Sequence, residues 1–549
     1  MPIDFDELKQ VEILHGPASV IWGSNALSAV INLRTKSPRE LQGLRLSVGM
    51  GERGVAFGGL RWAQAAGKVS YKVSASLYHH DPWPRKATLP DGSPAVGPLA
   101  YENPDFRQPK ADARLDYDVD ASHRWSFRLG YGGTSGMLFN ADLPLEFDRS
   151  TYMSFGDVSY TAPSFETRVY WTRSAGRLRS TLDRTLYPFR ADFPTAEITA
   201  HRALGIKHLV VYGGSARFDF FDVTGLTENT RHEFGGFVED QMFLHPKLTV
   251  NAGVRVDRVQ TSGAAVSPRL SLVVKPLPEH AFRVSVSRAF RAPTPVENFL
   301  ALPTAYPLNL APGLDVLIPF TVSGNRDLNQ VLSLGFEAGY TGVISKRHTL
   351  QLTTYRVRAT DTIQLGTTAL YSPLDPPTTW PFPAVTVPLG LLPKASGYRN
   401  GRITNQGVEA ALNSSWRGNT WSSLSYGYQA QPTLTESDPT LPVSLNEPPG
   451  HQFSALVGGR YGAWKGSAAA IFVGRTFWSD VLATDPRMRG FADAFTVINT
   501  SASYAARPSV ELVLKATNLL NRQVQQHAYG DIIGREVSVY INLNVKRKP

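Results

Sequence analysis

The segment KVSYKVSASLY, residues 68–78, decides the fold class. Apolar or aromatic side chains stand at every second position from Val69 to Leu77, and lysine or serine stands between them. Because side chains alternate across a β-strand, this pattern gives one apolar and one polar face, whereas a helix would scatter the same residues around its circumference. The segment is therefore predicted to be a strand.

The same alternation recurs from about residue 42 to the end of the chain, and it is clearest over 113–119, 124–131 and 537–545. Dividing the chain between QGLRLSVGM (42–50) and EVSVYINLNV (536–545) predicts about 22 strands. A soluble propeller would instead show self-similarity with a period of roughly 40–50 residues, and no such repeat is visible. The pattern indicates an all-β protein.

The spacers between the predicted strands alternate between short and long. Short spacers lie near 119–123, 162–165, 244–247, 277–280, 344–347, 416–419 and 505–508, and long ones near 80–110, 290–328, 364–400 and 430–448. Tight turns at one end and long loops at the other are typical of outer-membrane barrels, in which closure leaves no unpaired strand edge in the lipid. We therefore expect a transmembrane antiparallel β-barrel, and an even strand count places both chain ends on the periplasmic side.

Composition excludes several classes of protein. The chain has 549 residues and a mean hydropathy of −0.19, and no window approaches the ~18 uninterrupted apolar residues of a membrane helix. The absence of cysteine excludes disulfide frameworks and zinc–thiolate sites. The net charge of +10 is scattered, apart from the basic residues 546–548, so no nucleic-acid partner is predicted.

Neither an enzyme nor a metal protein is predicted. No serine stands in a Gly-x-Ser-x-Gly elbow, and no paired carboxylates stand out. His79 and His80 are adjacent on a predicted strand, so their imidazoles are expected on opposite faces and not on one metal ion. We expect no catalytic residue, no metal site and no cofactor.

A glycine-punctuated stretch, VEILHGPASVIWGSNALSAVINLRTKSP (11–38), precedes the first predicted barrel strand. Gly16 and Gly23 are expected to adopt conformations or close approaches that a Cβ would block, and Pro17 to stiffen a turn. The residues from Val30 to Leu33 are expected to continue as a buried strand. A phosphate-cradling loop is excluded, because the two glycines are seven residues apart and no lysine follows the second.

This stretch resembles the closing segment of the plug domain of TonB-dependent outer-membrane receptors. His15 stands where that family usually has arginine, and Ala29 where it usually has glycine. The resemblance continues over 234–258, 266–294, 405–412 and 512–545, so matching segments are spread along nearly the whole chain. The residues that carry the plug motif are Val11, Glu12, Gly16, Pro17, Gly23, Ser24, Asn25, Ala26, Val30, Ile31, Asn32, Thr35 and Lys36.

The resemblance implies a receptor in the outer membrane of a Gram-negative bacterium that actively takes up a scarce nutrient. The implied ligand is a ferric siderophore, with cobalamin, haem or a saccharide as alternatives. The implied partners are the TonB–ExbB–ExbD energy complex, a small-molecule iron chelate and the outer-membrane lipid around a monomeric barrel. Residues 1–38 are expected to form the end of a plug inside the barrel or at its periplasmic mouth, and residues 39–549 the barrel.

Three parts expected of this family are not visible in the sequence: a signal peptide, a TonB box and the earlier part of the plug. If these parts are encoded upstream, the transport interpretation stands. If they are not, the alternative is a passive outer-membrane pore or a non-functional remnant.

Candidate ligand-binding residues lie in the long spacers. An anionic ferric chelate would be bound by cations and aromatic faces at the external mouth. An aromatic girdle or loop packing is the favoured explanation for each of the same residues, because aromatic belts occur at both interfaces of any barrel. The candidates are Tyr306, Arg326, Tyr371, Trp380, Tyr398 and Arg399.

Overall fold

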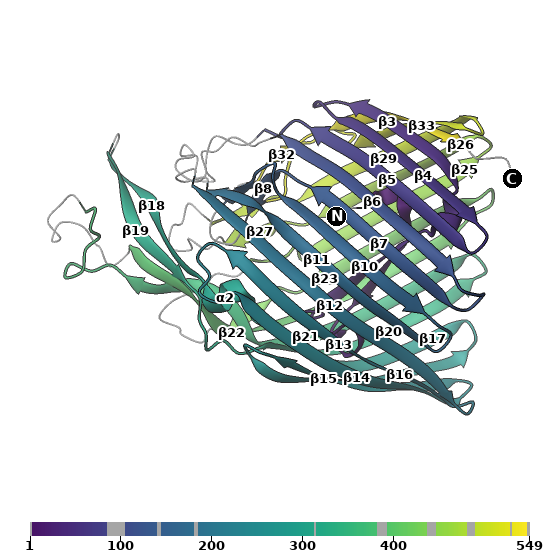
Figure 1. The fold of residues 1–549 in the computed structure, drawn as a ribbon, viewed down its shortest axis with the longest axis horizontal. Coiled ribbons are helices and arrows are strands. Elements are labelled where there is room, and N and C mark those ends of the chain that lie inside the picture. The colour runs from purple at the N-terminus through teal and green to yellow at the C-terminus, as the bar shows by residue number, and fades with distance from the viewer. Residues whose placement is uncertain are drawn as a thin grey trace.

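A closed antiparallel ring of 22 strands forms the body of the molecule (Figure 1). The computed structural model describes residues 3–84, 105–139, 144–180, 185–311, 314–380, 392–435, 446–479, 489–527 and 530–545. The ring closes where the first barrel strand pairs with the last, with Leu44 opposite Val545 and Ser47 opposite Asn542. The predicted fold class and strand count are confirmed.

Successive strands of the ring are hydrogen-bonded neighbours along the chain. In order they are β3 (Gly43–Gly51), β4 (Ala56–Ala66), β5 (Val69–His80), β6 (Phe106–Asp118), β7 (Arg124–Gly133), β10 (Tyr152–Thr161), β11 (Phe165–Ser180), β12 (Leu186–Leu204), β13 (His208–Val223), β14 (Thr230–His245), β15 (Leu248–Val259), β16 (Gly263–Leu277), β17 (His280–Arg291), β20 (Val331–Ser345), β21 (His348–Leu370), β22 (Pro393–Ser415), β23 (Thr420–Gln429), β25 (His451–Tyr461), β26 (Trp464–Val473), β29 (Phe495–Arg507), β30 (Val510–Thr517) and β33 (Glu536–Val545).

The two ends of the barrel differ as the spacers predicted. Short turns such as 67–68, 246–247 and 508–509 join the strands at one end. The other end carries the long connections, which we assign to the external side. A hairpin of β18 and β19 projects from that end (Figure 1). The small elements there are β8 (Gly136–Phe139), β9 (Pro144–Phe147), α2 (Pro295–Phe299), β18 (Ala301–Ala311), β19 (Leu314–Ser323), β24 (Thr433–Thr435), β27 (Thr476–Ser479), β28 (Arg489–Ala492), β31 (Val524–Gln525) and β32 (Ile532–Ile533).

The polarity of the barrel is inverted relative to a water-soluble protein. Along β3, Leu44, Leu46, Val48 and Met50 are 38–70% exposed, while Ser47 between them is buried. Inward-facing carboxylates are deeply buried and paired with guanidinium groups, as in Arg255–Asp257 at 2.7 Å and Arg231–Asp219 at 2.7 Å. An apolar exterior and a polar interior are what strands in lipid require. Among the helices of the described residues, none has the length and hydrophobicity of a membrane span.

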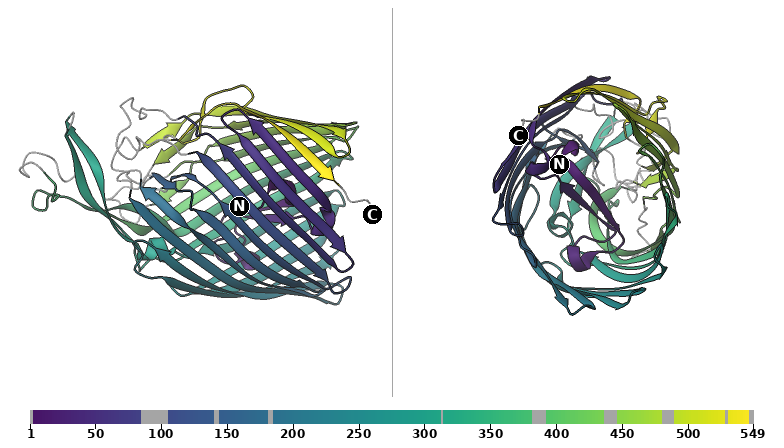
Figure 2. Two further views of the ribbon diagram at one scale, coloured as in Figure 1. Left: turned by 45° about the horizontal axis from the view of Figure 1, so that its top comes forward. Right: turned by 90° about the vertical axis from the view of Figure 1, so that its right-hand side faces the viewer.

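The N-terminal segment lies inside the ring. The view along the barrel in Figure 2 shows it crossing the lumen. Its two strands pair with each other, with Val11 opposite Leu33 and Ile13 opposite Ile31. We call residues 3–41 the lumenal segment; its elements are η1 (Phe5–Glu7), β1 (Leu8–His15), α1 (Ser19–Trp22), β2 (Ala29–Thr35) and η2 (Pro38–Glu40).

Candidate functional site

The connection between β1 and β2 is fixed to the inner wall. The amide of Asn25 donates to the carbonyl of Phe290 on β17 at 3.0 Å, and the amide of Phe290 donates to Ser19 Oγ at 3.3 Å. Val20 of α1 is only 1% exposed and lies against Gly253 of β15. The connection therefore docks on the wall formed by β14 to β17.

Two glycines of this connection have the special geometry that the sequence predicted. Gly16 and Gly23 have φ values of 79° and 75°, a region that side chains with a Cβ rarely adopt. A Cβ on Gly23 would stand 3.0 Å from a guanidinium nitrogen of Arg255. That guanidinium is already bonded to Asp257 and, at 2.8 Å, to Ser215. The glycine at position 23 allows the lumenal segment to approach a buried ion pair of the wall.

The other motif residues organise the hairpin itself. Glu12 accepts hydrogen bonds from Asn32 Nδ2 at 2.8 Å and Arg34 Nη1 at 3.3 Å. Lys36 donates through Nζ to the carbonyl of Asp6 at 2.7 Å. Thr35 Oγ1 accepts from Arg114 of the wall at 3.4 Å. Val11 and Val30 lie in the paired strands, Pro17 lies against Gly335, Ser24 precedes Asn25 at the docked turn, and Ala26 is 4% exposed.

The expectation that Val30, Ile31 and Leu33 form a buried strand is half wrong. They do form strand β2, but Ile31 is 64% and Leu33 37% exposed. The reason is that β2 hydrogen-bonds only to β1 within the described residues, so the hairpin stands free of the barrel sheet. An alternating pattern predicts a strand but not what covers it.

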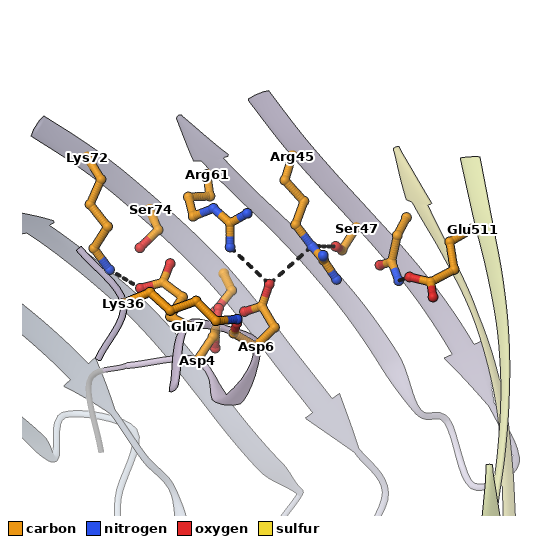
Figure 3. A network of polar contacts seen from close by, with 12 residues as sticks. Asp4, Asp6, Glu7, Lys36, Arg45, Ser47, Arg61, Lys72, Ser74 and Glu511 are labelled. Carbon is orange, nitrogen blue, oxygen red and sulfur yellow. Dashed lines mark hydrogen bonds and ion pairs between the residues drawn. The ribbon is translucent and has the colours of Figure 1, made fainter. Parts of the chain in front are cut away.

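An acidic run at the start of the lumenal segment meets a basic stretch of the wall (Figure 3). Asp6 Oδ2 lies 3.1 Å from Arg45 Nε and 3.2 Å from Arg61 Nη1. Asp4 accepts from Ser76 Oγ at 3.0 Å and lies 3.4 Å from Lys110 Nζ. We call this network the acidic latch. It consists of Asp4, Asp6 and Glu7 on the lumenal segment, and of Arg45, Arg61, Lys72, Ser76 and Lys110 on β3 to β6.

The centre of the acidic latch is buried. Lys72 pairs with Glu7 and lies 2.7 Å from Asp112, and the Lys72 and Glu7 side chains are 3% and 1% exposed. Burial of a charge is costly unless it is paired, and breaking one member of such a pair costs about 3–5 kcal/mol. The latch therefore holds the first residues of the segment on the wall.

The far end of the lumenal segment has a more exposed ion pair. Glu40 accepts from Lys9 Nζ at 2.8 Å and from the amide of Ser37 at 2.7 Å, which closes a capping box around η2. The hydrogen bond from Lys9, helped by that from Ser37, lowers the pKa of Glu40 to about 2. Both side chains are well exposed, so this pair contributes much less than the buried one.

Two cavities flank the lumenal segment. One, of about 350 Å³, lies beside the acidic latch and is lined by cations including Arg45, Lys110 and Lys515. The other, of about 560 Å³, lies between β1 and the opposite wall, where His15 faces a region containing Glu409. The lumen is thus polar, charged and only partly filled by the described residues.

Several predicted ligand residues gather at the base of the β18–β19 hairpin. Tyr371, 6% exposed, donates to the carbonyl of Pro319 at 2.7 Å and packs in an apolar cluster with Ile318 and Trp380. Arg326 binds Glu228 at 3.1 Å and lies over the Phe299 ring at 5.2 Å. The contacts of Tyr371, Trp380 and Arg326 are thus those of loop-packing residues.

The remaining candidates lie on neighbouring strands. The carbonyl of Tyr398 accepts from Asn325 Nδ2 at 3.0 Å. Arg399 stands opposite Gln364 on β21, close to Gly366. Tyr306 is paired with Ile318 in the hairpin, and its side chain lies outside the described part of the structure.

The acidic latch was not predicted, although a signal for it was present. The run DFDE at residues 4–7 concentrates three carboxylates, and Arg45, Arg61 and Lys72 all occupy polar positions of alternating strands. Inward-facing cations on adjacent strands would have indicated a basic wall. Which acidic run meets that wall depends on long-range packing that alternation does not encode.

Comparison with known proteins supports the resemblance to TonB-dependent receptors. The model of the family described as TonB dependent receptor-like, beta-barrel matches residues 50–519. The iron-regulated outer membrane virulence protein of Vibrio cholerae is 21% identical over 312 residues, covering 52% of this chain and 44% of that relative. The chain thus matches less than half the length of this curated relative.

Solved structures share the fold over nearly the whole chain. The FrpB iron transporter of Neisseria meningitidis has a TM-score of 0.74 and 14% identity, covering 99% of this chain and 88% of its own. The siderophore receptor PirA of Pseudomonas aeruginosa has a TM-score of 0.69 and 14% identity, covering 98% and 87%. The ferric enterobactin receptor PfeA has a TM-score of 0.74 and 15% identity, covering 98% and 86%. With the closed barrel, its inverted polarity and the matched family model, the chain belongs to the family of TonB-dependent receptors, as its motifs predicted.

Proposed function

We propose that this protein imports a ferric siderophore across the outer membrane of a Gram-negative bacterium, driven by the TonB–ExbB–ExbD complex. The observation that carries the proposal is the acidic latch, which holds a segment inside a closed polar barrel by ion pairs, while the strands of that segment form a sheet of their own. The names of the similar proteins, an iron transporter, a siderophore receptor and a ferric enterobactin receptor, support iron chelates as cargo.

In this proposal residues 1–38 are the closing part of a plug and residues 39–549 the barrel. The supporting observation is the change in partners at this point of the chain. Up to Thr35 the strands pair with each other, and from Gly43 the chain pairs with the barrel sheet. Movement of the segment would then free the cavities beside it without breaking any barrel pairing.

The external mouth is proposed as the ligand site of a monomeric receptor embedded in outer-membrane lipid. Arg326 and Arg399 would supply positive charge, and Tyr306, Tyr371, Trp380 and Tyr398 would supply aromatic surface. Tyr371 and Trp380 would act chiefly by fixing the hairpin, since both pack in its apolar cluster.

The test is uptake of ⁵⁵Fe by cells that lack their own siderophore receptors and express the complete gene. Ferric complexes of catecholate, hydroxamate and carboxylate siderophores are compared with haem and cobalamin, each in cells with and without TonB. We expect TonB-dependent uptake of one ferric siderophore class. Uptake that persists without TonB would overturn energised transport in favour of a passive pore, and exclusive uptake of haem or cobalamin would overturn the siderophore assignment.

A matched pair of variants tests the mouth. Arg326→Gln combined with Arg399→Gln should raise the KM for the ferric siderophore several-fold. Arg417→Gln removes an exposed charge from a short turn at the opposite end and should leave uptake unchanged. Equal behaviour of the two variants would contradict the proposed ligand site.

A further inference from the structure

The outer surface of β17 and β20 to β22 can be assigned residue by residue. On β20, Gly335 lies beside Pro17 and Glu337 beside Gly16, so both face the lumen. Because strand residues alternate between faces, the neighbouring Leu334 and Phe336 face the lipid, and they are 40% and 54% exposed.

Four arginines share this lipid-facing surface. Leu334 pairs with Arg288 on one side and Arg358 on the other, and Phe336 pairs with Arg356. Thr360, on the same face as Arg358, pairs with Arg402. Cross-strand partners lie on one face of a sheet. We call Arg288, Arg356, Arg358 and Arg402 the outer arginine cluster.

The cluster is compact. Arg356 and Arg358 are two residues apart on one strand, roughly 7 Å, and Arg402 is on the diagonal from Arg358 at roughly 7–8 Å. Arg288 lies two strands from Arg358, roughly 10 Å. Four positive charges therefore face the lipid within a patch roughly 15 Å across.

The positive charge of the cluster is not neutralised by the protein. Over the part of the chain that the structure describes, none of the four guanidinium groups has a hydrogen bond, ion pair or ring contact. The acidic side chains of these strands either face the lumen or accept a hydrogen bond. Glu337 and Glu409 line the lumen, and Asp361, in a bulge, accepts from Asn329 at 3.3 Å.

The cluster lies at the upper edge of the apolar band. Arg356 and Arg358 are about nine residues above the short turn at His348, which on a strand tilted by about 40° is a rise of roughly 23 Å. The apolar band of such barrels is about 25 Å tall. Below the cluster lie Phe282, Val284, Leu352 and Val408, which are 43–59% exposed.

We propose that the outer arginine cluster binds the headgroup of a glycolipid that carries more than one phosphate, of the lipid A type, in the external leaflet. Guanidinium groups match phosphate oxygens in a bidentate geometry. A single phospholipid phosphate would satisfy only part of a four-arginine patch, whereas a diphosphorylated disaccharide can span it. The acyl chains would lie on the apolar side chains below the cluster.

The test is titration of the purified full chain in detergent with diphosphorylated lipid A, followed by native mass spectrometry. The variant carries Arg356→Gln, Arg358→Gln and Arg402→Gln. Its matched control carries Arg202→Gln, Arg347→Gln and Arg417→Gln, which removes three exposed charges near the short-turn end. We expect the affinity to fall at least tenfold in the variant and to stay unchanged in the control.

Two further titrations separate the sources of affinity. Lipid A stripped of phosphate should bind wild type as weakly as intact lipid A binds the variant, and inorganic phosphate should not compete at millimolar concentration. Equal binding of wild type and variant, or of intact and stripped lipid, would overturn the proposal, as would displacement by inorganic phosphate. Should the variant fail to fold, wild-type affinity must still fall steeply between 0.1 and 1 M NaCl, and a flat response would refute a charged site.

Discussion

Replacing Lys72 by glutamine tests whether the acidic latch holds the lumenal segment. The substitution leaves Glu7 and Asp112 facing each other without their shared cation, at sites that are 1% and 9% exposed. Removing one partner of a buried pair costs about 3–5 kcal/mol, because the remaining charge is uncompensated. At 1.4 kcal/mol per factor of ten, the population of undocked segment should rise roughly 150- to 4,000-fold.

Amide hydrogen exchange measures this change directly. The amide of Lys36 donates to the carbonyl of Glu7 at 2.9 Å, and the amide of Glu7 donates to Asp4 at 3.1 Å. Peptides covering residues 3–9 and 34–38 should therefore lose protection in Lys72→Gln, while peptides from the barrel strands keep theirs. Local opening is expected because barrel pairings do not depend on the latch.

Lys9→Gln is the matched control, since Lys9 pairs with Glu40 at 2.8 Å but both side chains are at least 38% exposed. An exposed pair contributes about 0–1 kcal/mol, so protection should change less than about fivefold. The double variant Glu7→Gln with Lys72→Gln should recover part of the loss. If Lys72→Gln and Lys9→Gln reduce protection equally, the latch is not what holds the segment.

Three further outcomes are expected. Gly23→Ala should weaken docking of the lumenal segment, measured by limited proteolysis, more than Gly67→Ala does. Both glycines have a positive φ, but only at Gly23 does the added Cβ stand 3.0 Å from a guanidinium nitrogen. Equal proteolysis of the two variants would refute this prediction. Leu129→Arg, at a lipid-facing position 63% exposed, should destabilise the barrel in vesicles by up to about 2–4 kcal/mol, while Tyr461→Arg beside a short turn should cost about 0–1 kcal/mol; a neutral Leu129→Arg would contradict the assigned membrane face. The pKa of Glu40 lies near 2, below its ordinary value of 4.5. The ionised carboxylate therefore stabilises η2 fully above pH 4.5, and this stabilisation is lost as the pH falls towards 2. NMR titration of the labelled Glu40 carboxyl should show a midpoint near pH 2, and Lys9→Gln should raise that midpoint.

The barrel could be predicted from sequence because its requirements are local. Alternation such as that from Val69 to Leu77 reports a strand with one lipid-facing side, and β5 covers Val69–His80. The short turns also fall where spacers such as 416–419 placed them. Each of these features depends only on neighbouring residues.

The contents of the lumen depend on residues far apart in sequence. Asp6 meets Arg61 and Glu7 meets Lys72, which requires both the register of the wall strands and the path of the segment. The external hairpin is a similar case, since prolines at 303, 307 and 319 argue against strands, yet β18 and β19 pair beyond the barrel. Proline is tolerated there because the hairpin carries edges that need no partner.

Closure of the ring imposes an order on biogenesis. The seam between β3 and β33 joins Leu44 to Val545, about 500 residues apart in the chain, so the last strand must be synthesised before the cylinder can exist. Until then both seam strands expose unpaired backbone N–H and C=O groups and apolar side chains, which makes the unfinished sheet prone to aggregation. The lumenal segment directly precedes β3, so it must either be enclosed as the seam forms or enter afterwards through an open end. Assembly therefore requires that both free edges stay unpaired with other chains until the last strand meets the first.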